Sequence, residues 1–222
     1  MAGDVAQRAR LRKLGTAGAL RYDPARVAKH APVRYTARMT DLTWKLGARS
    51  PGHDYRVFTT SFVDAVHPRT GAVKRFSLIA CPDWVNVIAL TDDQRVVLLR
   101  QYRAGVDRVC LEIPGGMIDP GEDPIAAAMR ELAEETGYTG GTAELIGKVS
   151  PNPALQDNTL YTVLVRGVAL TQAPTPDDGE VLAAETASLA ECQARLVAGE
   201  IEHALVVVAF AHLALRAGPL MV

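Results

Sequence analysis

The sequence predicts an α+β domain in which helices pack against a mixed β-sheet. Its 222 residues are 48% apolar, which is enough to form one core with an appendage. Strand-like segments come first, a helix follows, and further strand-like segments lead to two more helical segments. This order of elements is typical of an α+β fold, or of a layered α/β/α arrangement around a mixed sheet.

The first part of the chain carries little periodic signal. Residues 1–54 contain scattered Arg and Pro and one aromatic landmark, Trp44. We therefore expect an N-terminal extension over residues 1–54 and a main domain over residues 55–222.

Strand-like segments begin after this extension. They are rich in Val, Ile, Leu and aromatic residues, and the first four are Arg56–Val66, Arg75–Ala80, Trp84–Leu90 and Arg95–Tyr102. The polar stretches HPRTGA and TDDQ between them have hairpin length, so we expect an antiparallel meander. Further strands are expected at Val109–Gly116, Ala143–Ser150 and Leu160–Leu170, and helices at Leu189–Glu200 and His203–Gly218.

The clearest local signal is a capped helix over Pro124–Thr136. Asp123 is a good N-cap, Pro124 suits the first turn, and Gly137 is placed to end the helix in a left-handed cap. At 3.6 residues per turn its expected buried stripe is Ile125, Met129 and Leu132.

Composition argues against several classes of partner. The 24 basic and 25 acidic side chains leave a net charge of -1, and the one strongly basic run, Arg8–Leu14, has no interleaved aromatic residues, so we expect no nucleic-acid partner. The longest apolar run, Ala204–Gly218, is too short and too polar to span a membrane. The N-terminus lacks the apolar core of a secretory signal, and three cysteines without metal spacing favour reduced thiols. We expect a cytoplasmic protein.

Three carboxylates share one face of the expected helix. Glu131 and Glu135 lie one turn apart with Glu134 beside them, and such like-charge pairs cost a few tenths of a kcal/mol each. A solvated helix face could absorb that cost. Arg130 and the exposed backbone expected at Pro114–Gly116 favour a different interpretation, because a hard divalent cation would accept these oxygens and convert the repulsion into binding.

This stretch resembles the signature of the Nudix hydrolase superfamily, G-x5-E-x7-R-E-U-x-E-E-x-G-U, where U is apolar. The matching residues are Gly116, Glu122, Arg130, Glu131, Leu132, Glu134, Glu135, Gly137 and Tyr138. The resemblance implies the Nudix fold, an α/β/α sandwich, and hydrolysis of a nucleoside diphosphate linked to another moiety with two or three Mg²⁺ or Mn²⁺ ions. It implies that Glu131 and Glu135 are the principal metal ligands, that Glu134 and the Gly115 carbonyl add oxygens, and that Glu122 and Arg130 form a supporting ion pair.

Three further stretches resemble the subgroup that hydrolyses ADP-ribose and related nucleoside diphosphate sugars. By this resemblance Arg103 of "QYR" contacts the diphosphate, and Pro153 lies near a characteristic proline, although "SPNPALQDN" replaces the subgroup's Pro-Gly-rich turn. The loop "TPDDGEVL" stands where the subgroup has a mobile general base, which implies Glu180, or Asp178 as second choice. The resemblance also implies a homodimer to which the N-terminal extension contributes.

The remaining aromatic and histidine residues leave alternatives open. Trp84 could stack on a nucleobase, and a tryptophan in the core or in a dimer interface is the commoner alternative. His203 and His53 match no constellation and are taken as incidental. Hydrolases of GDP-mannose, UDP-sugars, NADH or FAD, and a non-catalytic nucleotide sensor, are the competing functions.

Overall fold

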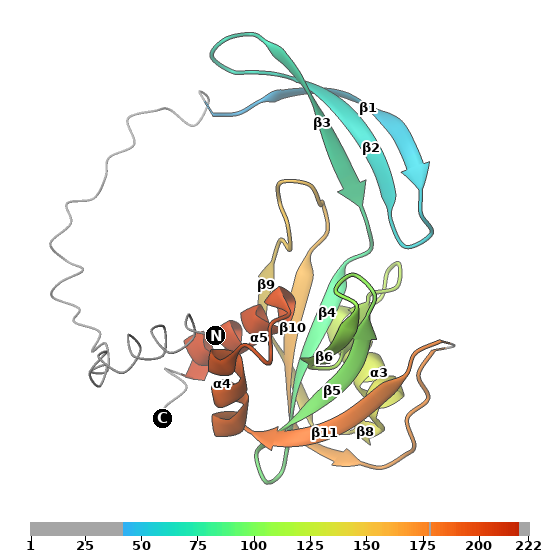
Figure 1. Cartoon of the computed structure of the whole chain (residues 1–222), viewed down its shortest axis with the longest axis vertical. Helices are drawn as coiled ribbons and strands as arrows, with labels where there is room; N and C mark the ends of the chain where they lie inside the picture. The colour runs from blue at the N-terminus through green and yellow to red at the C-terminus, as the bar shows by residue number, and fades with distance from the viewer. Residues whose placement is uncertain (1–41, 178, 218–222) are drawn as a thin grey trace, which may run out of the picture. The chain divides into compact units, whose positions relative to one another are not determined.

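The computed structural model describes residues 42–177 and 179–217 (Figure 1). The basic run Arg8–Leu14, most of the expected N-terminal extension, and Asp178 lie outside the described residues. The described residues from Trp44 onward belong to one compact unit.

A three-stranded antiparallel sheet opens this unit. It consists of β1 (Lys45–Asp54), β2 (Thr59–Val66) and β3 (Val73–Ala80), paired in that order. Every residue of β1 is exposed, so this strand shows no alternation of buried and exposed positions. The boundary expected at residue 54 stays a prediction, and it falls between two strands that pair.

The main sheet has eight strands among the described residues. They are β4 (Trp84–Thr91), β5 (Arg95–Arg103), β6 (Arg108–Glu112), β7 (Gly115–Met117), β8 (Tyr138–Thr139), β9 (Thr142–Val149), β10 (Leu160–Leu170) and β11 (Leu182–Ser188). The central path runs β11-β5-β4-β10-β8, with β6 paired to β5, β7 to β4 and β9 to β10. The β4–β10 pair is parallel and the others are antiparallel, which confirms a mixed sheet.

The continuous meander expected from the sequence was wrong in one place. The hairpins β2–β3 and β4–β5 form at the predicted turns. Within the described residues, however, β3 does not pair with β4, because β4 takes β10 as its parallel partner in a different sheet. Turn chemistry predicts which neighbours form a hairpin, but it carries no information on partners distant in the sequence.

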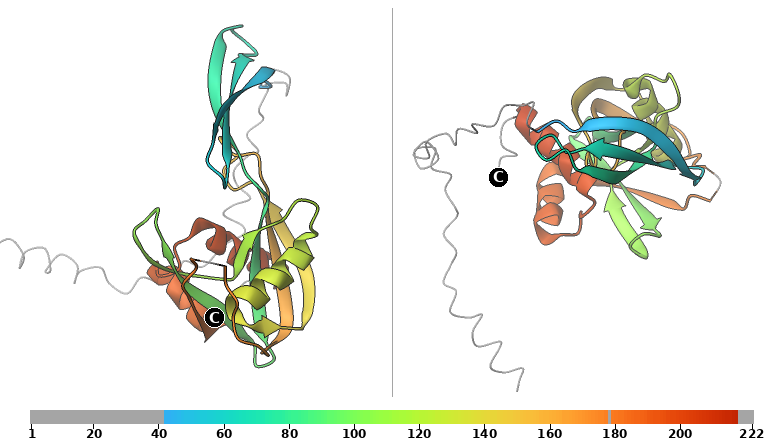
Figure 2. Two further views of the ribbon diagram at one scale, coloured as in Figure 1. Left: turned by 90° about the vertical axis from the view of Figure 1, so that its right-hand side faces the viewer. Right: turned by 90° about the horizontal axis from the view of Figure 1, so that it is seen from above.

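Helices cover both faces of the main sheet (Figure 2). Helix α3 (Pro124–Thr136) packs on one face, where Val85, Val87 and Ala89 of β4 belong to its core cluster. Helices α4 (Leu189–Ala198) and α5 (Ala204–Ala217) pack on the other face, where Ile88 and Leu90 of the same strand belong to theirs. Alternate residues of β4 thus enter two cores, and the expected α/β/α sandwich is confirmed.

Helix α3 has the bounds and the caps that the sequence predicts. Asp123 accepts hydrogen bonds from the N–H groups of Ile125 and Ala126, and Gly137 ends the helix at φ 74°. A side chain at Gly137 would also meet the carbonyl oxygen of Gln172 at 2.1 Å. The buried stripe is shifted from the one expected, because Ala127, Ala128 and Leu132 are buried while Ile125 and Met129 are only partly so. In the part of the chain described, no helix is long and apolar enough to cross a membrane.

Candidate active site

The face of α3 that carries the glutamates lines a cavity of about 470 Å³, here called the carboxylate cavity. Strand β7, the end of β5 and the loop before β11 form its other walls. Its lining contains most of the expected site residues, namely Arg103, Gly115, Arg130, Glu131, Glu134, Glu135 and Glu180, together with Gln101, Gly116, Met117, Asp119 and Asp177. Segments that are far apart in the sequence therefore meet where the signature predicts a site.

Two glycines let β7 lie directly against α3. A Cβ atom on Gly116 would stand 2.4 Å from Oε1 of Glu131, so a side chain there would displace that carboxylate. The backbone N–H of Gly115 donates a hydrogen bond of 2.9 Å to Oε2 of Glu135. The close approach of strand and helix aims both carboxylates at the same small volume.

Burial and mutual repulsion destabilise the charged forms of these two carboxylates. Burial, with the nearby charges of Glu131 and Glu180, raises the pKa of Glu135 to about 8, although the Gly115 N–H acts in the opposite direction. Burial is also the main cause that raises the pKa of Glu131, and Arg130 opposes it. Without a cation the ionised forms are therefore disfavoured, and a bound divalent cation would stabilise the charges that burial and repulsion oppose.

Arg130 connects the signature residues. Its guanidinium donates to both oxygens of Glu122 at 3.0 and 2.9 Å, to Glu131 at 2.9 Å and to Glu134 at 3.2 Å. A further hydrogen bond of 3.1 Å reaches the carbonyl oxygen of Met117 in β7. Hydrogen bonds from Arg130 are the main cause that lowers the pKa of Glu122. The expected Glu122–Arg130 ion pair is present, and it ties the loop before α3 to the helix.

The donor set fits a divalent cation in its chemistry. Glu131, Glu134 and Glu135 offer oxygen atoms as ligands, as does the carbonyl group of Gly115, and hard ions such as Mg²⁺ and Mn²⁺ prefer oxygen. Among the described residues, no three acidic, histidine or cysteine side chains already form a cluster arranged to hold a metal ion. Arg130 engages Glu131 and Glu134 instead, so these two side chains would have to exchange that partner for a metal.

The expected general base lies at this cavity. Glu180 is exposed and lines the cavity together with Asp177, whose carbonyl oxygen accepts a hydrogen bond of 3.0 Å from the Glu180 N–H. Its charge contributes to the raised pKa values of Glu131 and Glu135. Asp177 was not considered as a candidate from the sequence, although it stands in the same acidic run.

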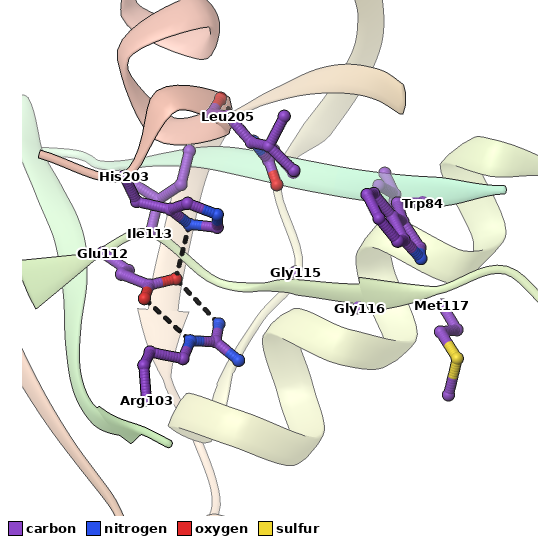
Figure 3. Close-up of a pocket in the computed structure, with 11 residues that line it drawn as sticks. Trp84, Arg103, Glu112, Ile113, Gly115, Gly116, Met117, His203 and Leu205 are labelled. Atoms are coloured by element: carbon purple, nitrogen blue, oxygen red, sulfur yellow. Dashed lines mark hydrogen bonds and ion pairs between the residues drawn. The ribbon is translucent and has the colours of Figure 1, made fainter. Parts of the chain in front are cut away.

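A second cavity, here called the Trp84 cavity, is shown in Figure 3. It has a volume of about 340 Å³. Both cavities are lined by Arg103, Gly115, Gly116 and Met117. The remaining lining of the Trp84 cavity is largely apolar and includes Trp84, Val85, Ile113 and Leu205, with Asn86, Glu112 and His203 as polar groups. Trp84 thus lines a cavity that shares a wall with the carboxylate cavity, as the base-stacking alternative requires.

Arg103 and two residues without an assigned role form a hydrogen-bonded cluster at this junction (Figure 3). The guanidinium of Arg103 donates from Nε and Nη2 to the two oxygens of Glu112 at 2.8 and 2.7 Å. His203 Nδ1 lies 3.0 Å from Oε2 of the same carboxylate. The sequence reasoning missed Glu112, for which the only signal was an acid ending an apolar strand, and took His203 as incidental.

Two residues named from the sequence lie elsewhere. Pro153 is exposed in the loop between β9 and β10, and it lines neither the carboxylate cavity nor the Trp84 cavity. That loop is bound to β3, where the Ile79 N–H donates to the carbonyl oxygen of Leu155 at 2.8 Å. His53 is exposed in β1, with its ring 4.7 Å from that of Tyr55.

Comparison with known proteins places this geometry in a family. A family model described as the NUDIX domain matches residues 82–205. The chain is 30% identical over 111 residues to an ADP-ribose pyrophosphatase of Bacillus subtilis, covering 50% of this chain and 60% of that protein. It is 42% identical over 92 residues to the ADP-sugar pyrophosphatase of Mus musculus, covering 39% and 42%.

Other relatives carry different names. A methanol dehydrogenase activator of Bacillus methanolicus is 33% identical over 107 residues, covering 48% of this chain and 58% of that protein. The matched part of the chain thus spans 42% to 60% of these curated relatives. A crystal structure of an ADP compounds hydrolase has the same fold, with a TM-score of 0.69, 24% identity, and coverage of 79% of this chain and 96% of that one.

Proposed function

Because the chain belongs to the Nudix hydrolase family, we propose that it hydrolyses the pyrophosphate bond of ADP-ribose or a related nucleoside diphosphate sugar. The products are a nucleoside monophosphate and a sugar phosphate. The observation that carries this proposal is the carboxylate cavity, in which Glu131, Glu134, Glu135 and Glu180 meet beside Arg103.

The two cavities support this proposal because together they offer room for a diphosphate and for the moiety attached to it. The diphosphate lies in the carboxylate cavity, where the guanidinium of Arg103 binds it. The Trp84 cavity shares a wall with the carboxylate cavity and accepts a planar or sugar moiety against the indole. The names of the relatives, an ADP-ribose pyrophosphatase and an ADP-sugar pyrophosphatase, support an adenine nucleotide as the substrate.

Glu131 and Glu135 are the main candidates to hold Mg²⁺ or Mn²⁺, with Glu134 and the Gly115 carbonyl as further donors. A bound divalent ion supplies charge neutralisation of the phosphate oxygens and a water of lowered pKa. Arg130 and Glu122 orient the helix glutamates. Glu180, on its exposed loop, accepts the proton of the attacking water when substrate has excluded solvent.

The proposal extends to assembly and location. We expect the enzyme to act as a homodimer, to which residues 1–54 contribute, and to work in the cytoplasm on small-molecule nucleotides. Light scattering coupled to size-exclusion chromatography, with the full chain and with a chain lacking residues 1–43, tests the expected dimer.

A panel of nucleotides tests the activity. ADP-ribose, GDP-mannose, UDP-glucose, NADH and FAD are each incubated with Mg²⁺, with Mn²⁺ or with EDTA, and the products are identified by chromatography. We expect ADP-ribose to be cleaved to AMP and ribose 5-phosphate with either metal and to remain intact with EDTA. Faster cleavage of another nucleotide of the panel would replace ADP-ribose as the proposed substrate. Binding without hydrolysis would favour the alternative function of a nucleotide sensor.

A further inference from the structure

We infer that His203 is a positioning residue for Arg103, and that it acts by holding the carboxylate of Glu112. This inference rests on the proposed function in one respect, because Arg103 is assigned there to the diphosphate.

Glu112 is a buried acceptor with both oxygens occupied. It ends β6 with only 4% of its surface exposed. Oε1 accepts from Arg103 Nε, and Oε2 accepts from both Arg103 Nη2 and His203 Nδ1. Burial would raise the pKa of Glu112, but the hydrogen bonds from Arg103 and His203 outweigh it and lower the pKa to about 2. The carboxylate is therefore ionised at neutral pH and can only accept, so Nδ1 of His203 carries the proton.

Arg103 stands at the junction of the cavities. It lines the carboxylate cavity, the Trp84 cavity and a third cavity of about 450 Å³ beside the β5–β6 turn. Glu112 engages Nε and one N–H of Nη2, and among the hydrogen bonds of the described residues none involves the Nη1 of Arg103, so Nη1 can donate to a ligand. A bidentate contact fixes the plane of the guanidinium relative to the carboxylate, but the two side chains could still move together. The third donor removes this freedom, because His203 anchors the carboxylate from a different element.

Hydrogen bonds to the first turn of α5 hold the backbone of His203 in place. The carbonyl oxygen of His203 accepts hydrogen bonds from the N–H groups of Val206 and Val207 at 2.9 and 3.0 Å, at the start of α5. His203 is thus attached to a helix that packs in the core. Arg103, in contrast, is the last residue of β5 and lies next to the exposed β5–β6 turn. A series of hydrogen bonds that runs from the start of α5 through His203 and Glu112 to Arg103 therefore holds the guanidinium at the shared wall of the cavities.

The neighbouring residue provides a matched control. Glu202 precedes His203 and forms an ion pair with Arg108 on the same β5–β6 hairpin. Both partners of that pair are exposed, with 42% and 56% of their side-chain surfaces accessible. Arg108 lies opposite Arg103 in the β5–β6 pairing, but in the described part of the chain neither side chain of the pair hydrogen-bonds to the side chain of Arg103 or Glu112. Loss of the Glu202 ion pair therefore removes a contact of the same loop and none of the side-chain hydrogen bonds of the cluster.

Steady-state kinetics on ADP-ribose with Mg²⁺ tests the inference in a double-mutant cycle. His203→Ala should raise KM by about 3- to 10-fold, the effect of one hydrogen bond, with a smaller change in kcat. His203→Asn keeps a donor at the position of Nδ1 and should restore KM to within about twofold of wild type. Glu202→Gln should leave KM unchanged. In an Arg103→Ala background, His203→Ala should cause no further rise, because its effect passes through Arg103.

The inference would be overturned if His203→Ala raised KM equally in wild type and in the Arg103→Ala background. It would also be overturned if Glu202→Gln raised KM as much as His203→Ala does, because both results would show a merely structural role. A readout without substrate separates this failure from failure of the proposed function. The Nε–H resonance of Arg103, assigned by its loss in Arg103→Lys, should exchange with water at least about threefold faster in His203→Ala and unchanged in Glu202→Gln. If wild type cleaves no nucleotide of the panel, the proposed function fails, and this exchange measurement still decides the role of His203.

Discussion

The carboxylate of Glu135 accepts a hydrogen bond from the backbone N–H of Gly115 at 2.9 Å, and this contact joins α3 to β7 at the floor of the carboxylate cavity. Glu135 is also the buried acid whose pKa is raised to about 8, chiefly by burial. Glu135 thus contributes both to the packing of α3 on β7 and to the proposed metal site. A substitution that keeps the hydrogen bond and removes the charge separates these two roles.

Glu135→Gln should lower kcat with Mg²⁺ by orders of magnitude and leave the fold intact. The neutral amide keeps an oxygen for the Gly115 N–H but loses the charge that a divalent ion requires. Without metal the variant should be as stable as wild type or slightly more so, because burial and Glu131 disfavour the charged form of Glu135 and the amide cannot ionise. Turnover and thermal unfolding in EDTA measure the two effects, with exposed Glu200→Gln as the control. Full activity would remove Glu135 from the metal ligands.

Glu180→Gln should lower kcat by about 10²- to 10⁴-fold, the usual contribution of a general base. Affinity for substrate and the Mg²⁺ requirement should change little, because the residue lies on an exposed loop. Asp177→Asn and Asp178→Asn are the matched variants in the same acidic run, and both should be much milder. If Asp178→Asn is the inactive variant, the general base lies earlier in the loop than Glu180. If none of the three substitutions lowers kcat, Glu134 becomes the candidate for the general base.

Arg103→Ala should raise KM for ADP-ribose more than it lowers kcat, since a diphosphate contact stabilises the ground state and the transition state alike. Arg103→Lys should not restore KM, because an ammonium group cannot hold Glu112 through two parallel hydrogen bonds and also present a donor to the phosphate. Unchanged kinetics in both variants would assign Arg103 a structural role.

Trp84→Leu should raise KM for nucleotides that present their base to the Trp84 cavity. Loss of one stacked base costs about 1–3 kcal/mol, which corresponds to roughly 5- to 150-fold. The thermal unfolding midpoint shows whether the substitution also damages the core. A fall in stability with an unchanged KM would support the alternative that Trp84 belongs to the core or to an interface.

Glu112 should make the free energy of unfolding depend on pH in the acid range. Its pKa in the folded protein, about 2, lies below the ordinary value of 4.5, so its contribution is present above about pH 4.5 and is lost as the pH falls toward 2. The shift corresponds to about 3 kcal/mol. Denaturant titrations of wild type and Glu112→Gln should differ most near pH 6 and converge near pH 2. A constant difference across this range would contradict the assignment.

The part of the site that lies on one helix could be predicted from the sequence. The caps at Asp123 and Gly137, the bounds of α3 and the shared face of Glu131 and Glu135 all follow from interactions within a few residues. The Nudix signature adds the Glu122–Arg130 pair, whose partners are eight residues apart. These interactions join residues that are close in the sequence and need no partner from a distant segment, which is why these expectations agree with the structure.

Tertiary structure alone decided the partners that come from distant segments. His203 and Glu112 are separated by 91 residues, and they meet only because β6 pairs with β5 while α5 begins beside the end of β6. Pro153 is close to the signature in the sequence, yet its loop is bound to β3 instead. Periodicity and capping describe how a segment folds; which buried carboxylate receives which donor depends on strand pairing across the whole sheet, and no local signal encodes that pairing.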